Sequence, residues 1–395
     1  MENELVFPNL DKVFFNYKSL MSQPELAEQI KKELINNTFQ YHLKNNYEYR
    51  QYVNRLGISD LSCSISVDEI PLLPSSFFKG LQFALSTVPE TTIIKYCTSS
   101  GTQGSLSIVP RDETTLMHFL SSIASSFPVL LQIDRTGNHR GVVLGPSTED
   151  AGDLWFSYAM ACLTLQVTTT ICERNEVFDI DYSVNQIKYF LEKKHDLIIV
   201  GPPFRILDIC EKIKSTQNFP PLTPKSFVIS AGGWKSKQNK SINKIDFINI
   251  VSDAFQTKDH SQVRDCFNMV ELNTIILECE HHHKHIPPWL SIQARDPRTN
   301  SVLKDGESGI LAFLDATAVS YPCFILSEDI GTVSDIKCRC GRKGKVVNIE
   351  RRMSRIEARG CALKMTTGNK NKAQKDFKDR YFESFYRDPG AYLER

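Results

Sequence analysis

The chain has 395 residues, a length that predicts two or three domains. Hydrophobic residues make up 41% and charged residues 24%, the composition of an ordinary globular protein and not of a collagen, a coiled coil or a secreted disulfide scaffold. Lysine and arginine total 47 against 46 for aspartate and glutamate, so the net charge of +1 gives no reason to expect a nucleic-acid partner or a membrane surface.

Targeting signals are not visible in the sequence. No apolar run approaches the roughly 18 residues that a membrane-spanning helix needs. Residues 1–10 are acidic and are interrupted by Pro8, unlike a secretory signal peptide. We therefore expect a cytoplasmic protein without a membrane span, whose 11 cysteines are mostly reduced thiols.

The first predicted elements are a helix, a β-hairpin and a second helix. Apolar residues recur at close to helical spacing over 24–45, and Pro24 suits the first turn of a helix. The β-branched run 91–97 predicts a strand, and 106–109 predicts a second strand closed by Pro110. Residues 112–127 predict an amphipathic helix with acidic residues at its positive end.

Later segments alternate between strand-like and helix-like patterns. Residues 197–200 and 227–229 predict buried strands, and 204–214 predicts a helix between them. This alternation favours an α/β sheet with functional residues at the strand ends.

The composition changes near residue 330. Between positions 337 and 359 nine basic residues face two acidic ones, and Phe377, Tyr381 and Phe385 recur at a spacing of four. We expect a large multi-sheet α/β domain over 1–330 and a small α+β domain over 331–395 that ends in an amphipathic tail helix.

The loop between the first two predicted strands is rich in hydroxyls and glycines. Glycines allow backbone N–H groups to turn inward and hydroxyls add donors, so the loop could hold a phosphate. The alternative is a solvated hairpin turn, because the lysine and following helix of a P-loop are missing. The residues concerned are Thr98, Ser99, Ser100, Gly101, Thr102 and Gly104.

Further candidates follow predicted strands. Gly232 and Gly233 would allow the backbone to approach a flat ligand, or would simply form a tight turn. Phe267 could stack on a base and Glu271 could bind magnesium, although a core aromatic and a surface acid would give the same pattern. Asp329 could accept ribose hydroxyls, or serve as a turn aspartate before Gly331.

Three cysteines near the C-terminus have candidate roles. Cationic neighbours between 351 and 365 would lower the thiol pKa of Cys361 and make it a nucleophile; a small buried core cysteine is the alternative. Cys338 and Cys340 could supply two thiolates to zinc, and a histidine from 281–285 could complete the site in space. The basic stretch 337–359 lacks the interleaved aromatics of a nucleic-acid site, so closure over phosphates explains it better.

The order of these motifs resembles the adenylate-forming ligase superfamily and, more narrowly, the acyl-protein synthetase (LuxE) family of bacterial bioluminescence. The similarity covers roughly residues 10–366. It rests on residues 96–104, the segments 108–112, 201–204, 232–235, 264–274, 285–289, 305–309 and 320–322, and the Gly-Cys-Ala-Leu sequence at 360–363.

The resemblance implies a role for each candidate. The loop residues would hold the phosphates of ATP, with Gly232 and Gly233 lining the adenine pocket and Phe267 stacked on the base. Glu271 would bind Mg²⁺, Asp329 would accept the ribose hydroxyls, and Arg351 would lie near ribose and phosphate. Cys361 would be the acyl-accepting cysteine. The lysine that usually steers the carboxylate stays open among Lys364, Lys370, Lys372 and Lys375.

The implied activity is that of an acid–thiol ligase. A long-chain fatty acid would attack ATP to give acyl-AMP, Cys361 would take the acyl group as a thioester, and an acyl reductase partner would receive it. The alternative is a ligase that delivers an acyl or aryl acid to coenzyme A or a carrier protein. A non-catalytic scaffold that docks a partner through its tail helix is a third reading. The acyl chain length and the assembly size, a homo-oligomer included, stay open.

Overall fold

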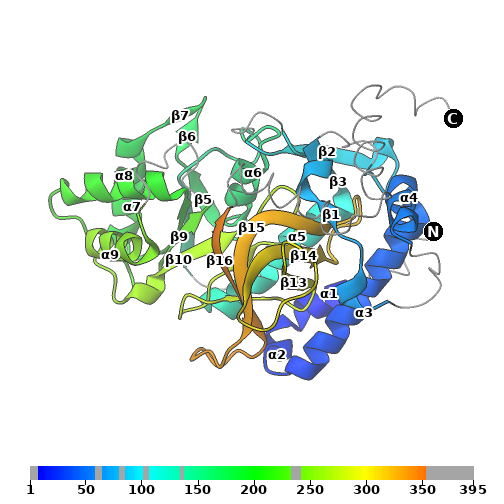
Figure 1. Ribbon diagram of the computed structural model, residues 1–395. Coiled ribbons are helices and arrows are strands. Elements are labelled where there is room, and N and C mark those ends of the chain that lie inside the picture. Colours follow the sequence, from blue (N-terminus) through cyan, green and yellow to red (C-terminus); the bar gives the residue numbers. More distant parts are fainter. Residues whose placement is uncertain are drawn as a thin grey trace.

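The computed structural model describes residues 8–57, 65–79, 85–100, 106–133, 138–232 and 242–352 (Figure 1). The α-helices within these ranges are α1 Pro8–Phe15, α2 Tyr17–Leu20, α3 Pro24–Asn45, α4 Tyr47–Arg55, α5 Glu113–Ser126, α6 Trp155–Cys162, α7 Ile180–Glu192, α8 Pro203–Lys214 and α9 Lys244–Phe255. The strands are β1 Leu73–Pro74, β2 Ile93–Thr98, β3 Ile108–Asp112, β4 His139–Val143, β5 Thr168–Ile171, β6 Glu173–Arg174, β7 Val177–Phe178, β8 Asp196–Gly201, β9 Phe227–Ala231, β10 Val263–Phe267, β11 Ile276–Leu277, β12 Lys284–His285, β13 Leu290–Arg295, β14 Ser308–Asp315, β15 Phe324–Asp335 and β16 Lys345–Arg352.

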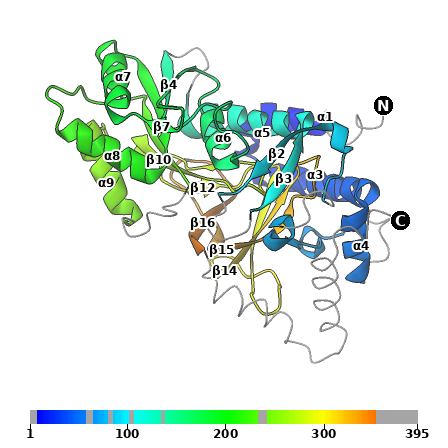
Figure 2. The ribbon, with the colours of Figure 1, turned by 90° about the horizontal axis from the view of Figure 1, so that it is seen from above.

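The first sheet has the order β11-β10-β9-β8-β4-β5 and is parallel except for β11. Its central strand β8 is apolar on both faces: Leu197 and Ile199 pack with α7, α8 and α9, whereas Ile198 and Val200 join the main core. This burial on both sides explains why the strand is a continuous apolar run in the sequence. The three helices lie together at one end of the molecule (Figures 1 and 2).

The second sheet has the order β12-β16-β15-β14-β13 and is antiparallel, with the short β1 added in parallel to β15. Seven of the eight residues of β14 are buried. The N-terminal helices α1 to α4 lie at the end of the molecule opposite α7 to α9 (Figures 1 and 2). Helix α3 contacts β13 of this sheet.

The predicted elements agree well with the structure. Helix α3 has the predicted bounds, and α8, β8 and β9 lie where the pattern placed them. One detail was wrong: Pro110 does not close its strand but lies within β3, paired with Tyr96. A proline is tolerated there because the β2–β3 pair is a separate two-stranded ribbon, in which each strand has an unpaired edge.

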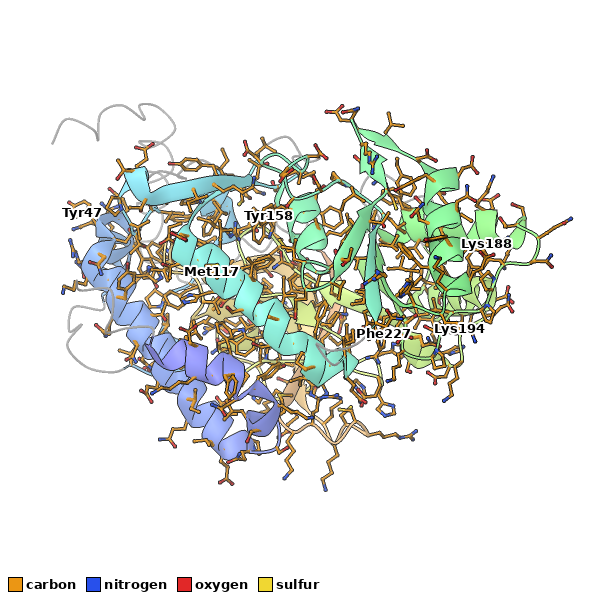
Figure 3. All side chains as sticks on the ribbon, turned by 180° about the vertical axis from the view of Figure 1, so that it is seen from behind. Tyr47, Met117, Tyr158, Lys188, Lys194 and Phe227 are labelled. Atoms are coloured by element: carbon orange, nitrogen blue, oxygen red, sulfur yellow. The ribbon has the colours of Figure 1, made fainter. Side chains whose placement is uncertain are left out.

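Helix α5 begins after Asp112, whose carboxylate accepts a hydrogen bond from the backbone N–H of Thr115 at 2.9 Å. Figure 3 shows α5 crossing the back of the molecule with Met117 labelled on it, and the Met117 side chain is exposed. Together with the π-helical turn Phe127–Leu131, it is the one helix of the described chain that is long and apolar enough to cross a membrane. Because 56% of that window is buried inside the protein, this is weak evidence for a membrane span and equally fits a core helix.

The division into domains at residue 330 stays a prediction. Strand β15 runs through residues 330 and 331, and β16 pairs with it in the same sheet. Residues 353–395, with most of the expected small domain and its tail helix, lie outside the described residues.

Candidate active site

The hairpin β2–β3 carries the loop predicted to hold phosphates. Its base is closed by two hydrogen bonds between Ser99 and Ser107: the Ser99 N–H donates to the Ser107 carbonyl, and the Ser107 N–H donates to Ser99 Oγ, both at 3.0 Å. Thr98 is anchored outside the hairpin, since its N–H and its hydroxyl donate to the carbonyl of Asp153 at 2.7 and 3.2 Å. These hydrogen bonds fix Thr98 and Ser99 at the start of the loop, where Ser100 is exposed.

Gly232 comes directly after β9, at the carboxyl end of a parallel strand. Its φ of +73° is a conformation that side chains disfavour, and a Cβ at this position would lie 2.4 Å from the ring of Phe156. The backbone turn thus needs glycine for two reasons, one conformational and one steric. Gly233 lies outside the described residues, as do Gly101, Thr102, Gly104 and Cys361.

Phe267 is the last residue of β10, the parallel strand next to β9. It therefore lies at the same carboxyl edge of the sheet as Gly232. Its ring stacks on that of Phe313 in β14, with centroids 5.7 Å apart and an interplanar angle of 17°. Phe313 is fully buried, whereas Phe267 is half-buried. The second sheet thereby supports one face of the Phe267 ring.

Glu271 lies in the turn that follows β10 and is 6% exposed. The carbonyl of Glu271 accepts hydrogen bonds from Tyr321 Oη and Cys323 Sγ, both at 3.1 Å. These contacts fix the backbone that carries the carboxylate, and carboxylate oxygens are ligands that Mg²⁺ prefers.

Asp329 and Arg351 lie at consecutive positions of one ladder in the second sheet. In the β15–β16 ladder Asp329 is opposite Arg352, and Arg351 is opposite Ile330. The N–H of Asp329 donates to Ser327 Oγ at 3.0 Å, which holds the backbone at that point. Two candidates that are 22 positions apart in the sequence therefore lie on neighbouring strands.

Arg111 also belongs to this region, although the sequence motifs predict no role for it. It is fully buried in β3, and its guanidinium donates to the carbonyl of Val270 at 2.7 Å and to Oδ1 of Asn273 at 3.1 Å. The guanidinium carbon lies 3.5 Å from the ring centre of Trp155, a cation–π contact. Arg111 thus joins the loop hairpin to the turn that carries Glu271. In the sequence, Arg111 is only one member of the segment 108–112 on which the family resemblance rests, and nothing there indicates its buried partners.

A buried polar network continues from Arg111 into the second sheet. Asn273 Nδ2 donates to the carbonyl of Thr115 at 2.9 Å and to Thr317 Oγ1 at 3.1 Å. The Thr317 hydroxyl in turn donates to Asp315 at 2.7 Å. Burial raises the pKa of the Asp315 carboxyl, and the hydrogen bonds from Thr317 oppose this effect. These buried hydrogen bonds favour one arrangement of the segments around the site, although Arg111 Nη1 and Asp315 Oδ2 have no partner within the described residues.

The described cysteines are buried, except for Cys340, which is half-buried. Burial raises the thiol pKa of Cys162 and Cys210 to about 12 and that of Cys172 to about 11. Burial also raises the thiol pKa of Cys97, Cys266 and Cys323. A thiol that resists ionisation is a poor nucleophile, so these cysteines are not suited to accept an acyl group.

Comparison with solved structures shows the fold class. The chain resembles 2-hydroxyisobutyryl-CoA ligase in complex with 2-HIB-AMP and CoA, with a TM-score of 0.65 and 15% identity over 83% of this chain and 68% of that one. An open conformation of the same enzyme has a TM-score of 0.62 and covers 82% of this chain and 74% of that one. The fold is that of the adenylate-forming ligases.

The sequence comparisons are more specific. The family model for acyl-protein synthetase, LuxE, matches residues 2–369. The long-chain-fatty-acid–luciferin-component ligase of Aliivibrio fischeri is 34% identical over 371 residues, covering 94% of this chain and 96% of the relative. The ligase of the same name from Vibrio harveyi is 31% identical, covering 92% and 95%. The chain therefore belongs to the acyl-protein synthetase (LuxE) family and is a ligase.

Proposed function

We propose that this enzyme activates a long-chain fatty acid with ATP and then holds the acyl group on Cys361 as a thioester. The observation that carries the proposal is the match to the family over residues 2–369, with relatives named long-chain-fatty-acid–luciferin-component ligase aligned along more than nine-tenths of both chains. The adenylate-forming fold supports the first half-reaction, because a neighbour of this fold was solved with an acyl-AMP bound.

In the first step, a carboxylate oxygen of the fatty acid attacks the α-phosphorus of ATP. The bond between the α-phosphorus and the bridging oxygen breaks, giving acyl-AMP and pyrophosphate. The loop residues Thr98, Ser99 and Ser100, together with Gly101, Thr102 and Gly104, would donate hydrogen bonds to the phosphates. Donors placed where negative charge develops lower the barrier without reorganising during the reaction.

The remaining nucleotide contacts are assigned to the edge where the two sheets meet. Gly232 and Gly233 would line the adenine pocket, and Phe267 would stack on the base with the ring face opposite Phe313. Asp329 would accept the ribose hydroxyls, with Arg351 near the ribose and phosphate. Glu271 would hold Mg²⁺, which when bound neutralises phosphate charge. Two hydrogen bonds to the backbone carbonyl of Glu271 support this assignment, because they fix the backbone position from which the carboxylate extends.

In the second step, the Cys361 thiolate attacks the carbonyl carbon of acyl-AMP and AMP leaves with the bonding electrons. The product is a thioester, which keeps the acyl group reactive for an acyl reductase partner. The raised thiol pKa values of the buried cysteines support Cys361 indirectly, because they remove most of the competing nucleophiles.

The proposal is tested by labelling the purified protein with radioactive fatty acid, ATP and Mg²⁺. We expect protein-bound label that neutral hydroxylamine releases, as a thioester requires. Cys361→Ser should lose this label yet still exchange pyrophosphate into ATP, because adenylation precedes the thiol step. Cys210→Ala, which removes a buried thiol of α8, is the matched control and should label normally.

Two outcomes would contradict the proposal. Normal, hydroxylamine-sensitive labelling of Cys361→Ser would exclude Cys361 as the acceptor. Rapid formation of a coenzyme A thioester by Cys361→Ser would favour the alternative ligase that bypasses the enzyme thiol. Pyrophosphate exchange screened over acetate, aryl acids and fatty acids of several lengths identifies the acid.

A further inference from the structure

Four side chains that the proposed reaction does not use meet where the two sheets join. They are Cys279 after β11, His285 in β12, and Cys338 and Cys340 in the connection between β15 and β16. One ligand atom from each lies within 4.8 Å of the ligand atoms of the other three. The sequence pattern predicts Cys338, Cys340 and a histidine as ligands, and the structure adds Cys279, which is 59 positions before Cys338.

Two distances within the cluster are close to those of a tetrahedral metal site. The Sγ atoms of Cys279 and Cys338 are 3.8 Å apart, and Cys340 Sγ is 3.2 Å from His285 Nε2. Zinc with bonds of about 2.3 Å to sulfur and about 2.0 Å to nitrogen places two sulfurs about 3.8 Å apart and a sulfur and a nitrogen about 3.5 Å apart. A disulfide would need a separation of about 2.05 Å between the sulfurs.

Most residues of this cluster are buried and shielded from solvent. Cys279 and His285 are almost completely buried, and Cys338 is 8% exposed. The ring atom of His285 that faces the cysteines is Nε2, 3.2 Å from Cys340 Sγ. Three buried or half-buried thiols and an imidazole nitrogen that face one another form the kind of ligand set that a buried metal ion requires.

Two tight turns present the ligands to one another. The Cys279 N–H donates to the carbonyl of His283, and the His282 N–H donates back to the carbonyl of Cys279, both at 2.9 Å. On the other side, the Gly341 N–H donates to the carbonyl of Cys338 at 3.1 Å. The N–H of His281 also lies 3.4 Å from Cys279 Sγ, the kind of contact that stabilises a metal-bound thiolate.

An ion pair holds the two turns together next to the cluster. Arg342, two residues after Cys340, donates to Glu280, one residue after Cys279, at 2.6 Å. Two segments about 60 residues apart in sequence are therefore already aligned by a contact outside the four ligands.

We propose that Cys279, His285, Cys338 and Cys340 bind one structural zinc ion. Four protein ligands complete a tetrahedron and leave no position open for a substrate, which is the arrangement of a structural site. Thiolates and an imidazole favour zinc over magnesium or calcium. The ion would tie the end of β11 in the first sheet and β12 in the second sheet to the β15–β16 connection.

The direct test is the metal content of the full chain. The protein is purified without a polyhistidine tag from cells grown with added zinc, and its metals are measured by inductively coupled plasma mass spectrometry. We expect about one zinc per chain, released when an organomercurial blocks the thiols and detected with a coloured zinc indicator. No zinc above background, one iron in its place, or a Cys279–Cys338 disulfide in non-reducing peptide mapping would each overturn the assignment.

Variants identify the ligands. Cys340→Ser, at the half-exposed corner, and His285→Gln should each lose most of the zinc and lower the midpoint of thermal unfolding. Cys210→Ser, a buried cysteine of α8, should keep the full zinc content. His283→Gln is the sharper control, because His283 Nδ1 lies 3.2 Å from Cys338 Sγ and yet is not among the four ligands. Loss of zinc in His283→Gln with retention in His285→Gln would overturn the choice of histidine.

A spectroscopic measurement keeps the proposal falsifiable if a variant folds poorly. Wild-type protein in which Co²⁺ replaces the native ion should show the visible absorption of tetrahedral, thiolate-bound cobalt. A spectrum typical of octahedral cobalt would contradict a site with three cysteine ligands.

Discussion

The guanidinium of Arg111 donates through Nε to Oδ1 of Asn273 at 3.1 Å, across 162 positions of the sequence. Arg111 lies in β3, which leads out of the loop assigned to the phosphates, and Asn273 belongs to the turn that carries Glu271. One buried contact therefore connects the two segments that we assign to the phosphates and to magnesium.

Replacing Arg111 by methionine should destabilise the protein by about 3 kcal/mol. The variant leaves the carbonyl of Val270 and the side chain of Asn273 buried without their donor, and each such loss costs about 1–3 kcal/mol. Urea-induced unfolding measures the change. The exposed Arg298→Met is the control and should stay within about 0.5 kcal/mol of wild type. Equal stability of the two variants would show that the Arg111 contacts are not energetically important.

Gly232→Ala should destabilise the protein and raise the KM for ATP. The alanine would have to adopt a φ of +73° and its Cβ would press on the ring of Phe156. Gly152→Ala is a matched control, because Gly152 also has a positive φ, of +54°, but open space around it. We expect about 1 kcal/mol for Gly152→Ala and clearly more for Gly232→Ala. If both cost the same, the contact with Phe156 is irrelevant.

Phe267→Ala should raise the KM for ATP about tenfold or more, because stacking on a base is worth about 1–3 kcal/mol. Phe267→Tyr keeps the ring and should restore most of the affinity. Phe190→Ala, at a half-buried aromatic of α7, controls for general loss of an aromatic side chain. An unchanged KM for ATP in Phe267→Ala, with a protein that remains folded, would exclude stacking on adenine.

The stability of the protein should fall between pH 7 and pH 5 because of His42. Burial lowers the pKa of His42 from 6.5 to about 3, so the native state stays neutral while the unfolded chain takes up a proton below pH 6.5. Stability is therefore lost as the pH falls, by about 1.4 kcal/mol per pH unit below 6.5, or about 2 kcal/mol at pH 5.

Unfolding by urea at the two pH values tests this. His42→Gln should show a drop in stability that is smaller by about 2 kcal/mol, whereas the exposed His260→Gln should keep the wild-type drop. An identical drop in His42→Gln and wild type would show that His42 is not held neutral. Its native contacts are Thr87 Oγ1 at 2.8 Å and the carbonyl of Ala318 at 3.1 Å.

Most secondary structure could be predicted because its causes are local. The bounds of α3 follow from Pro24 and the spacing of apolar residues, and β8 follows from a short run that is buried on both faces. The prediction that Pro110 ends its strand was wrong. A strand tolerates proline where one of its edges is unpaired, and the local sequence does not show which edges of a strand are paired.

The ligands of the proposed zinc site were likewise only partly predictable from the sequence. A Cys-x-Cys pair and a run of histidines are visible in the sequence, but Cys279 has no neighbouring cysteine to reveal it. Its sulfur lies near the other three ligands only because β11, β12 and the β15–β16 connection are adjacent in the folded protein. Similarly, nothing near Arg111 in the sequence indicates that Val270 and Asn273 accept its hydrogen bonds.

Family, fold class and the candidate residues for ATP could thus be read from the order of motifs along the chain, because each motif is a local feature. Which arginine links two of the candidate segments and which thiols lie next to a histidine depended on contacts between segments about 50 to 160 positions apart. Such contacts arise from the packing of the two sheets around a common core, where burial pairs polar groups that no spacing in the sequence relates.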